Sequence, residues 1–303
     1  MPPSANLDVR TKATGTDIAK AAVSKILTYS CVDGPGNRLV IFLQGCNFEC
    51  PTCHNPHTMS MCNHCGDCIS ACHASALSLV DGEISFDSSK CDQCDACLVA
   101  CPINANPMIQ YYSVAEILEL ARKYKPFLSG ITVSGGEATL QLKFVIALFE
   151  AVKADPNLSG LTCFIDTNGH LGAQSWSRLL PVTDGVMLDI KAFNPPLHQK
   201  LTGQDNQKTL QSAKITHAAG KLFELRYLAI PGQTDTKDEL EKLTQFVLSM
   251  GADVRVKLNA FQHHGVRGEA LGWEKMPKSG IDHIASHLRD AGVTSVVTPA
   301  LYL

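Results

Sequence analysis

The chain has 303 residues, 45% of them hydrophobic, which is enough to bury the core of one large domain with one small addition. The net charge of −3 gives no basic surplus for nucleic acid, and no apolar run is long enough to span a bilayer. The N-terminal stretch is polar and lacks the apolar segment of a secretory signal, so residues 1–24 are predicted to be a weakly ordered lead-in. We therefore expect a cytoplasmic protein with neither a nucleic-acid nor a membrane partner.

From Arg38 onward, short apolar runs alternate with helical stretches. The runs are rich in branched aliphatic residues and end in glycine or polar residues, as buried parallel strands do. The strands are predicted at 38–45, 130–136, 161–169, 185–191, 223–232 and 253–261. The helices are predicted at 113–124, 140–154, 174–180, 208–219, 238–250 and 281–291, and Ser113 with Glu116 forms a candidate capping box for the first. The pattern predicts an α/β fold, and we favour a partial (β/α)6 barrel, although periodicity leaves a doubly wound sheet open.

Cysteine is the outlier of the composition, with 13 residues. Twelve of them lie between Cys31 and Cys101, and only Cys163 stands apart. A disulfide framework is typical of short exported chains, so this clustering favours metal binding over disulfide bonding.

The first cysteine motif is Cys46-x3-Cys50-x2-Cys53, in the loop after the first predicted strand. Three thiolates on one short loop can hold three irons of a cubane cluster and leave the fourth iron open to a ligand. The loop also stands at the carboxyl end of a strand, where α/β barrels carry their sites. Taken alone, this spacing would equally allow a zinc site or a chance match.

The second motif is a cysteine run that occurs twice between residues 58 and 107. The two runs are Cys62-x2-Cys65-x2-Cys68-x3-Cys72 and Cys91-x2-Cys94-x2-Cys97-x3-Cys101. This is the spacing of bacterial two-cluster ferredoxins, in which the fourth cysteine of each run crosses to the other cluster. The segment 58–107 is therefore predicted to be a ferredoxin-like insertion with two [4Fe-4S] clusters, held by metal more than by a core. His73 stands where the pattern has proline.

The predicted ligands number three in the first motif and eight in the repeat, which is one short of the twelve that three clusters would need. The missing ligand corresponds to the open iron. Cys163 lies in an apolar run and is predicted to be a core residue, while Cys31 is left without a role.

These motifs together resemble those of the radical S-adenosylmethionine (SAM) superfamily. Besides the first cysteine motif, the chain carries SGGE at 134–137, DTNG at 166–169 and MLDIK at 187–191. The VDGPG element at 32–36 resembles that of the glycyl-radical-enzyme activating enzymes, and the whole pattern is most similar to the YjjW-type activases with a ferredoxin-like insertion. The resemblance assigns residues 25–57 and 108–303 to the radical SAM partial barrel.

The resemblance implies three [4Fe-4S] clusters and SAM as cofactors. SAM chelates the open iron in this family, and its reductive cleavage gives a 5′-deoxyadenosyl radical that removes a hydrogen from a backbone glycine of a partner enzyme. The partners implied are a glycyl-radical enzyme and a flavodoxin or ferredoxin reductant, with the insertion relaying electrons.

The resemblance also implies roles for individual residues. Cys46, Cys50 and Cys53 would carry the catalytic cluster, and Asp33 and Gly34 would face the glycine loop of the partner. The SAM contacts implied are Thr52, Cys53, His54, Gly135, Gly136, Glu137, Asp166, Asp189, Ile190, Lys191 and His263. Within this set, Glu137 and the two glycines would bind the methionyl amino group. Asp189 and Lys191, on one face of a strand end, would hold the carboxylate and ribose, and Asp166 would act near them through a monovalent cation.

The chain departs from the family in two of these places. Thr52 stands where members have an aromatic residue that contacts adenine. Late in the chain, Gln262 stands at the register of a SAM-contacting histidine, so that either Gln262 or the adjoining His263 or His264 would take that place.

Two other functions remain open at this level. The chain could be a radical SAM enzyme that modifies a small molecule or peptide with auxiliary clusters at the substrate. It could also be a plain electron carrier, but the βα body of about 200 residues would then have no purpose.

Overall fold

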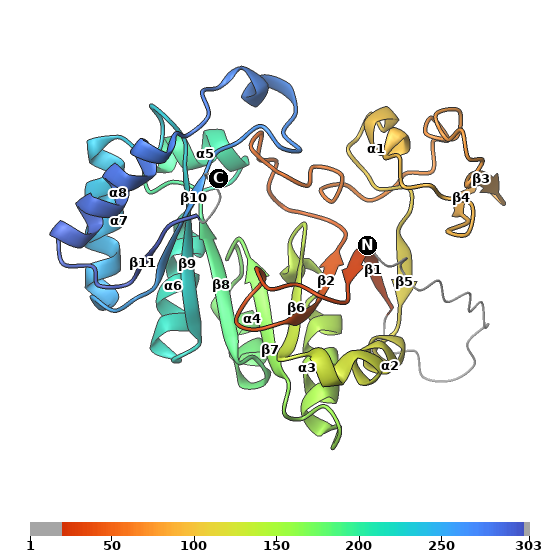
Figure 1. The fold of residues 1–303 in the computed structure, drawn as a ribbon, viewed down its shortest axis with the longest axis horizontal. Helices are drawn as coiled ribbons and strands as arrows, with labels where there is room; N and C mark the ends of the chain where they lie inside the picture. Colours follow the sequence, from red (N-terminus) through yellow and green to blue (C-terminus); the bar gives the residue numbers. More distant parts are fainter. Residues whose placement is uncertain (1–19, 300–303) are drawn as a thin grey trace.

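Nine strands form one curved sheet within residues 20–299, the part of the chain that the computed structural model describes (Figure 1). The strands are β1 (Ala21–Leu27), β2 (Arg38–Leu43), β5 (Gln110–Tyr112), β6 (Gly130–Gly135), β7 (Thr162–Thr167), β8 (Gly185–Ile190), β9 (Leu222–Ala229), β10 (Val256–Ala260) and β11 (Val296–Val297). Their order is β11-β10-β9-β8-β7-β6-β2-β1-β5. The six predicted strands are confirmed as β2 and β6 to β10, and each pairs in parallel with the next.

The helices follow the predicted alternation. They are α2 (Val114–Tyr124), α3 (Leu142–Ala154), α4 (Ala173–Leu179), α5 (Pro195–Thr202), α6 (Gln207–Ala218), α7 (Lys237–Met250) and α8 (Lys278–Asp290). The parallel strands follow one another across the sheet without the reversal of order that a doubly wound sheet requires. The open question is thereby decided in favour of the partial barrel. No helix within residues 20–299 is long and apolar enough to cross a membrane.

The start of the sheet differs from the prediction. Ala21–Leu27 was predicted to lie mostly in a weakly ordered lead-in, but it forms β1, which pairs antiparallel with both β2 and β5. The pairing buries Ala21, Ala22 and Val23. The sequence of β1 contains small alanines and no apolar run, so the strand is recognised only by its pairing with β2 and β5. The remaining lead-in, residues 1–19, lies outside the described residues.

Local sequence signals set the element ends. Ser113 caps α2 by accepting a hydrogen bond from the backbone N–H of Glu116, whose carboxylate accepts one from the N–H of Ser113, so the predicted capping box is confirmed. Cys163 is fully buried in β7, as predicted for a core residue.

The segment between Thr58 and Pro107 stands beside the barrel as a small unit of its own (Figure 1). It contains the hairpin β3 (Leu77–Val80) and β4 (Glu83–Phe86) and the short helix α1 (Ala96–Ala100). The hairpin was not predicted, although Asp81-Gly82 is the two-residue turn with positive φ that joins such strands. Only Cys68, Leu77, Cys97 and Leu98 are buried in its hydrophobic cluster. A core this small agrees with a unit that depends on bound metal.

Candidate active site

The three thiols of the first motif lie in the loop after β2, at the carboxyl edge of the sheet. The loop is anchored on two sides, because the N–H of Cys46 donates to the carbonyl of Met59 at 2.8 Å and the N–H of Glu49 donates to that of Thr202 at 2.9 Å. Burial raises the pKa of the Cys46 and Cys50 thiols to about 12. Buried thiols of this kind ionise only when bound metal compensates their charge, so the loop fits an iron–sulfur cluster held by Cys46, Cys50 and Cys53.

Lys191 and Asp189 form an ion pair at the end of β8, with 2.8 Å between Nζ and Oδ2. The pair bears out the expectation that these alternate residues share one face. Burial acts to lower the pKa of Lys191, but the carboxylate of Asp189 outweighs this effect and raises the pKa. Lys191 is therefore a fixed positive charge beside the thiol loop.

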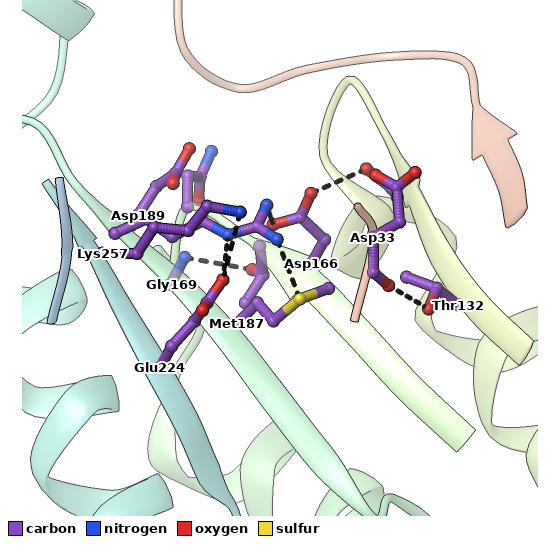
Figure 2. A network of polar contacts seen from close by, with 12 residues as sticks. Asp33, Thr132, Asp166, Gly169, Met187, Asp189, Glu224 and Lys257 are labelled. Carbon is purple, nitrogen blue, oxygen red and sulfur yellow. Dashed lines mark hydrogen bonds and ion pairs between the residues drawn. The ribbon is translucent and has the colours of Figure 1, made fainter. Parts of the chain in front are cut away.

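Asp166, at the end of β7, is held by two protein partners (Figure 2). Its Oδ1 lies 3.0 Å from Nη1 of Arg226, and its Oδ2 accepts a hydrogen bond from Ser134 at 2.9 Å. Arg226 also donates to Glu224 at 2.8 Å and lies 2.9 Å from the sulfur of Met187. Burial raises the pKa of Asp166, and the guanidinium of Arg226 acts in the opposite direction. Arg226 was not predicted, although a lone arginine in the apolar strand FELRYLA is the signal that would have found it.

Glu137 follows β6 and is almost fully buried, with 1% of its surface exposed. Its Oε1 accepts hydrogen bonds from Thr139 N–H (2.8 Å), Thr139 Oγ1 (2.6 Å) and Thr167 Oγ1 (2.8 Å), and its Oε2 accepts one from Asn168 N–H (2.7 Å). The sequence predicted that this carboxylate would bind the methionyl amino group. In the structure both oxygens accept hydrogen bonds within the protein, and Glu137 thereby joins the SGGE turn to the DTNG turn.

Gly135 and Gly136 are needed for a close approach within the protein. A Cβ atom on Gly135 would lie 2.2 Å from the backbone of Leu43, and one on Gly136 would lie 2.3 Å from the carbonyl of Gly45. The glycines therefore let the SGGE turn pack directly against the end of β2 and the start of the thiol loop.

The VDGPG loop is held from below by Arg38, which is fully buried. Arg38 donates to the carbonyl of Pro35 at 3.2 Å and to Oγ1 of Thr132 at 2.6 Å, and Thr132 in turn donates to the carbonyl of Asp33 at 2.7 Å. Further bonds run to the Ile131 and Thr162 carbonyls at 2.7 and 2.9 Å. Figure 2 shows Asp33 on the same side of the sheet as Asp166. Arg38, which was not predicted from the sequence, thus fixes the loop beside the site.

Arg38→Lys is expected to lower the free energy of unfolding by about 2 kcal/mol, because lysine keeps the charge but cannot reach all of these acceptors from one position. Hydrogen exchange of the backbone at 32–36 should accelerate. The comparison is Arg122→Lys, at an arginine with a half-exposed side chain paired to Asp155, where both measurements should stay unchanged. Equal stability of the two variants would contradict the anchoring role.

The remaining predicted contacts are distributed around the thiol loop. Thr52 and Ile190 are buried, at 5% and 1% exposure. His263 lies with Nε2 2.8 Å from the carbonyl of Trp273 and so faces the fold. Gln262 likewise donates to a backbone carbonyl. Which of Gln262, His263 and His264 takes the late SAM contact stays a prediction, with His263 as the predicted residue.

The two halves of the insertion repeat each other at a spacing of 29 residues. The N–H groups of His64 and Gln93 both donate to the first sulfur of their run at 3.4 Å, and those of Ala76 and Ala105 both donate to the last sulfur at 3.2 Å. Positive φ recurs at matched positions, in His64 (59°) and Gln93 (61°), and in Ser75 (51°) and Asn104 (54°). The repeat in the sequence is therefore a repeat in the backbone.

The thiols of the insertion lie in two groups. One cavity is lined by Cys72, Cys91, Cys94 and Cys97, which includes the last cysteine of the other run. Burial raises the pKa of Cys68 to about 11, and Cys62, Cys101 and Cys65 lie close enough to add to the increase. Each set of four fits one [4Fe-4S] cluster. His73 lies 2.6 Å from Asp92 and 3.9 Å from Cys94, at the rim of the first set.

Comparison with known proteins assigns the chain to a class. Residues 40–247 match the family model of the radical SAM superfamily, so the chain belongs to that superfamily and is a radical SAM enzyme. Within the superfamily, the chain belongs to the family of the pyruvate formate-lyase-activating enzymes. It is 32% identical to the one from Streptococcus mutans, over 75% of this chain and 72% of that protein. It is 30% identical to the pyruvate formate-lyase 1-activating enzyme of Escherichia coli K12, over 77% and 78% of the two chains. The resemblance to activating enzymes inferred from the motifs is thereby confirmed.

A solved structure shares the fold at low identity. Streptococcus suis SuiB, bound to its precursor peptide SuiA, superimposes with a TM-score of 0.53 at 12% identity, over 87% of this chain and 48% of SuiB. The likeness supports the radical SAM fold alone.

Proposed function

We propose that the protein is a glycyl-radical-enzyme activase, which uses SAM to place a radical on a backbone glycine of a partner enzyme. The observation that carries this proposal is the VDGPG loop, fixed by Arg38 and Thr132 beside the edge of the sheet that holds the three thiols. The two relatives named above act, by their names, on pyruvate formate-lyase. A rigid backbone loop next to the reactive centre is suited to receive an extended glycine segment.

The residues of the site divide the work. Cys46, Cys50 and Cys53 would hold the catalytic cluster, which would supply the electron for reductive cleavage of bound SAM. Lys191 offers a positive charge to the methionyl carboxylate, and the backbone of Gly135 and Gly136 borders the amino group. Thr52, His54, Ile190 and His263 border the adenosine, and Gln262 and His264 are the alternatives to His263.

The charged residues behind the site keep it in place. Glu137 fixes two of the turns, and Asp189 fixes Lys191. Asp166 is paired with Arg226, so a monovalent cation would have to share Asp166 with that guanidinium. Asp33 and Gly34 receive the glycine of the partner.

The insertion extends the proposal to three [4Fe-4S] clusters. Cys62, Cys65, Cys68 and Cys101 would hold one, and Cys72, Cys91, Cys94 and Cys97 the other. Both sets offer four thiols, so neither leaves an iron open for a substrate, which favours electron relay from a flavodoxin or ferredoxin. The YjjW-type assignment rests on this insertion and stays a prediction.

A glycine-centred signal is the expected result of the direct test. The anaerobically reconstituted and reduced enzyme is incubated with SAM and with each glycyl-radical enzyme of its host, and electron paramagnetic resonance (EPR) spectra are recorded. We expect a doublet from one partner and none when SAM is omitted. SAM cleavage without a doublet on any of these enzymes would reject the activase function and leave radical SAM chemistry intact.

A further inference from the structure

The insertion meets the barrel through its second half. Ala105 pairs with both Thr58 and Ser60. That short segment is itself bound to the thiol loop, because the carbonyls of Thr58 and Met59 accept hydrogen bonds from Gly45 and Cys46, both at 2.8 Å. Residues 58–60 therefore link Ala105 of the insertion to the thiol loop.

The two halves of the repeat differ in their contacts with the barrel. Ala105 donates its N–H to the sulfur of Cys101, and the matched Ala76 donates its N–H to the sulfur of Cys72. The carbonyl of Ala76, however, accepts a bond at 2.8 Å from Asp87, inside the insertion. Of the two equivalent positions, Ala105 is thus the one paired with the segment that binds the thiol loop.

A second attachment comes from the loop after β10. Arg267 donates through Nη1 to the side-chain oxygen of Asn104 at 3.0 Å and through Nη2 to the carbonyl of Leu98 at 3.2 Å. Within residues 20–299 it has no carboxylate partner within 4.0 Å. Both of its acceptors lie near Cys101, in the second half of the repeat. In Figure 1, α1 lies on the barrel side of the insertion and the β3–β4 hairpin on the far side.

The same loop also touches the catalytic thiol loop. Gly265 packs so closely on His54 that an added Cβ atom would lie 2.0 Å from the His54 carbonyl. One loop of the barrel therefore contacts both the residue after Cys53 and the half of the insertion that contains Cys101.

We propose that Arg267 is a positioning residue that holds the thiol set of Cys101 beside the catalytic thiol loop. This inference rests on the proposed relay role of the insertion. It gives the relay a direction, with the set of Cys62, Cys65, Cys68 and Cys101 next to the catalytic thiols and the set of Cys72, Cys91, Cys94 and Cys97 facing the donor. A one-electron donor is oxidised at the outer set, and one electron per SAM reduces the sulfonium as its bond to C5′ breaks.

The test measures electron transfer inside the reconstituted enzyme. The enzyme is reduced with titanium(III) citrate, freed of the reductant and mixed with SAM. Methionine, which is released once per electron when the sulfonium is cleaved, is followed with time. The first equivalent draws on the electron already at the catalytic loop, and the second needs one from the insertion. In Arg267→Ala the first should form at the wild-type rate, and the second should form about tenfold more slowly, because two hydrogen bonds that fix the junction are lost.

A spectroscopic measurement accompanies this assay. In the fully reduced wild-type enzyme, we expect the EPR signal that shifts on SAM addition to relax fast, through the nearby spin of the insertion. In Arg267→Ala this relaxation should slow, while Arg267→Lys should recover part of both effects. Arg122→Ala removes an arginine on α2 that pairs with Asp155, and it should behave as wild type.

The proposal would be overturned if Arg267→Ala, at full iron content, kept the EPR relaxation of the wild type and formed the second equivalent at the wild-type rate. If that variant loses iron from the insertion, Asn104→Gly decides, because glycine keeps the positive φ of this position and removes the acceptor. The same slowing of the second equivalent would support the proposal, and its absence would overturn it. Neither readout involves a glycyl radical, so both stay valid if the activase function fails.

Discussion

Cys50→Ala is expected to abolish SAM cleavage, and Cys94→Ala is expected to retain part of it with an artificial reductant. Cys50 is one of the three thiols of the catalytic loop and lies close enough to Lys191 for the lysine's charge to act on its pKa. Two thiols cannot hold the three irons that leave the fourth free for SAM. Cys94 is an exposed thiol of the cavity that Cys72, Cys91 and Cys97 also line. A small reductant can reduce the catalytic cluster directly and so does not need the insertion. The measurement is 5′-deoxyadenosine formed with excess titanium(III) citrate.

The comparison requires that both variants fold. Loss of a cluster in the insertion can unfold the insertion, because its apolar core is small. Iron content and circular dichroism should therefore be recorded for each variant, with Cys163→Ala as the control at a core cysteine outside every predicted cluster. Complete loss of cleavage in Cys94→Ala, with normal folding, would argue against a relay role for the insertion.

The parallel body of the fold was readable from the sequence because buried strands carry a strong local signal. Runs such as RLVIFL and GVMLDI are apolar on both faces, which is what β2 and β8 require. The strands that were missed depend on their neighbours. β1 has a lysine and two alanines and is defined by pairing with β2, and β11 has two residues. Helix α5 begins with two prolines, which hid it, although Asn194 caps it and proline suits a first turn.

The candidate site, too, was only partly predictable from the sequence. Cysteine spacing is a local property, so the sequence could group Cys72 with Cys91, Cys94 and Cys97, which line one cavity. The residues that hold the site together act across long sequence distances. Arg38 reaches Thr162, Glu137 reaches Asn168, and Arg267 reaches Asn104. No sequence pattern fixes such partners, because they are determined by how the strands and loops are arranged in the folded chain.

Glu137→Ala is expected to destabilise the enzyme by about 4 kcal/mol and to remove most SAM binding, because it deprives buried donors of their acceptor and releases two turns of the site. Glu137→Gln should cost less, about 2 kcal/mol, since its oxygen can keep the bonds from Thr139 and Thr167 while its amide opposes the N–H of Asn168. The measurements are denaturant unfolding and SAM binding by equilibrium dialysis on the reconstituted enzyme.

The matched control is Glu116→Gln. Glu116 is also a glutamate that accepts a backbone N–H, but it does so at the capping box of α2, where glutamine serves equally well. Stability and SAM binding of this variant should equal those of the wild type. The two roles considered for Glu137 differ in their outcome. A carboxylate that bound the methionyl amino group would lose affinity in Glu137→Gln at unchanged stability. If the carboxylate joins the two turns, as its four hydrogen bonds indicate, Glu137→Gln must lower stability and SAM affinity together.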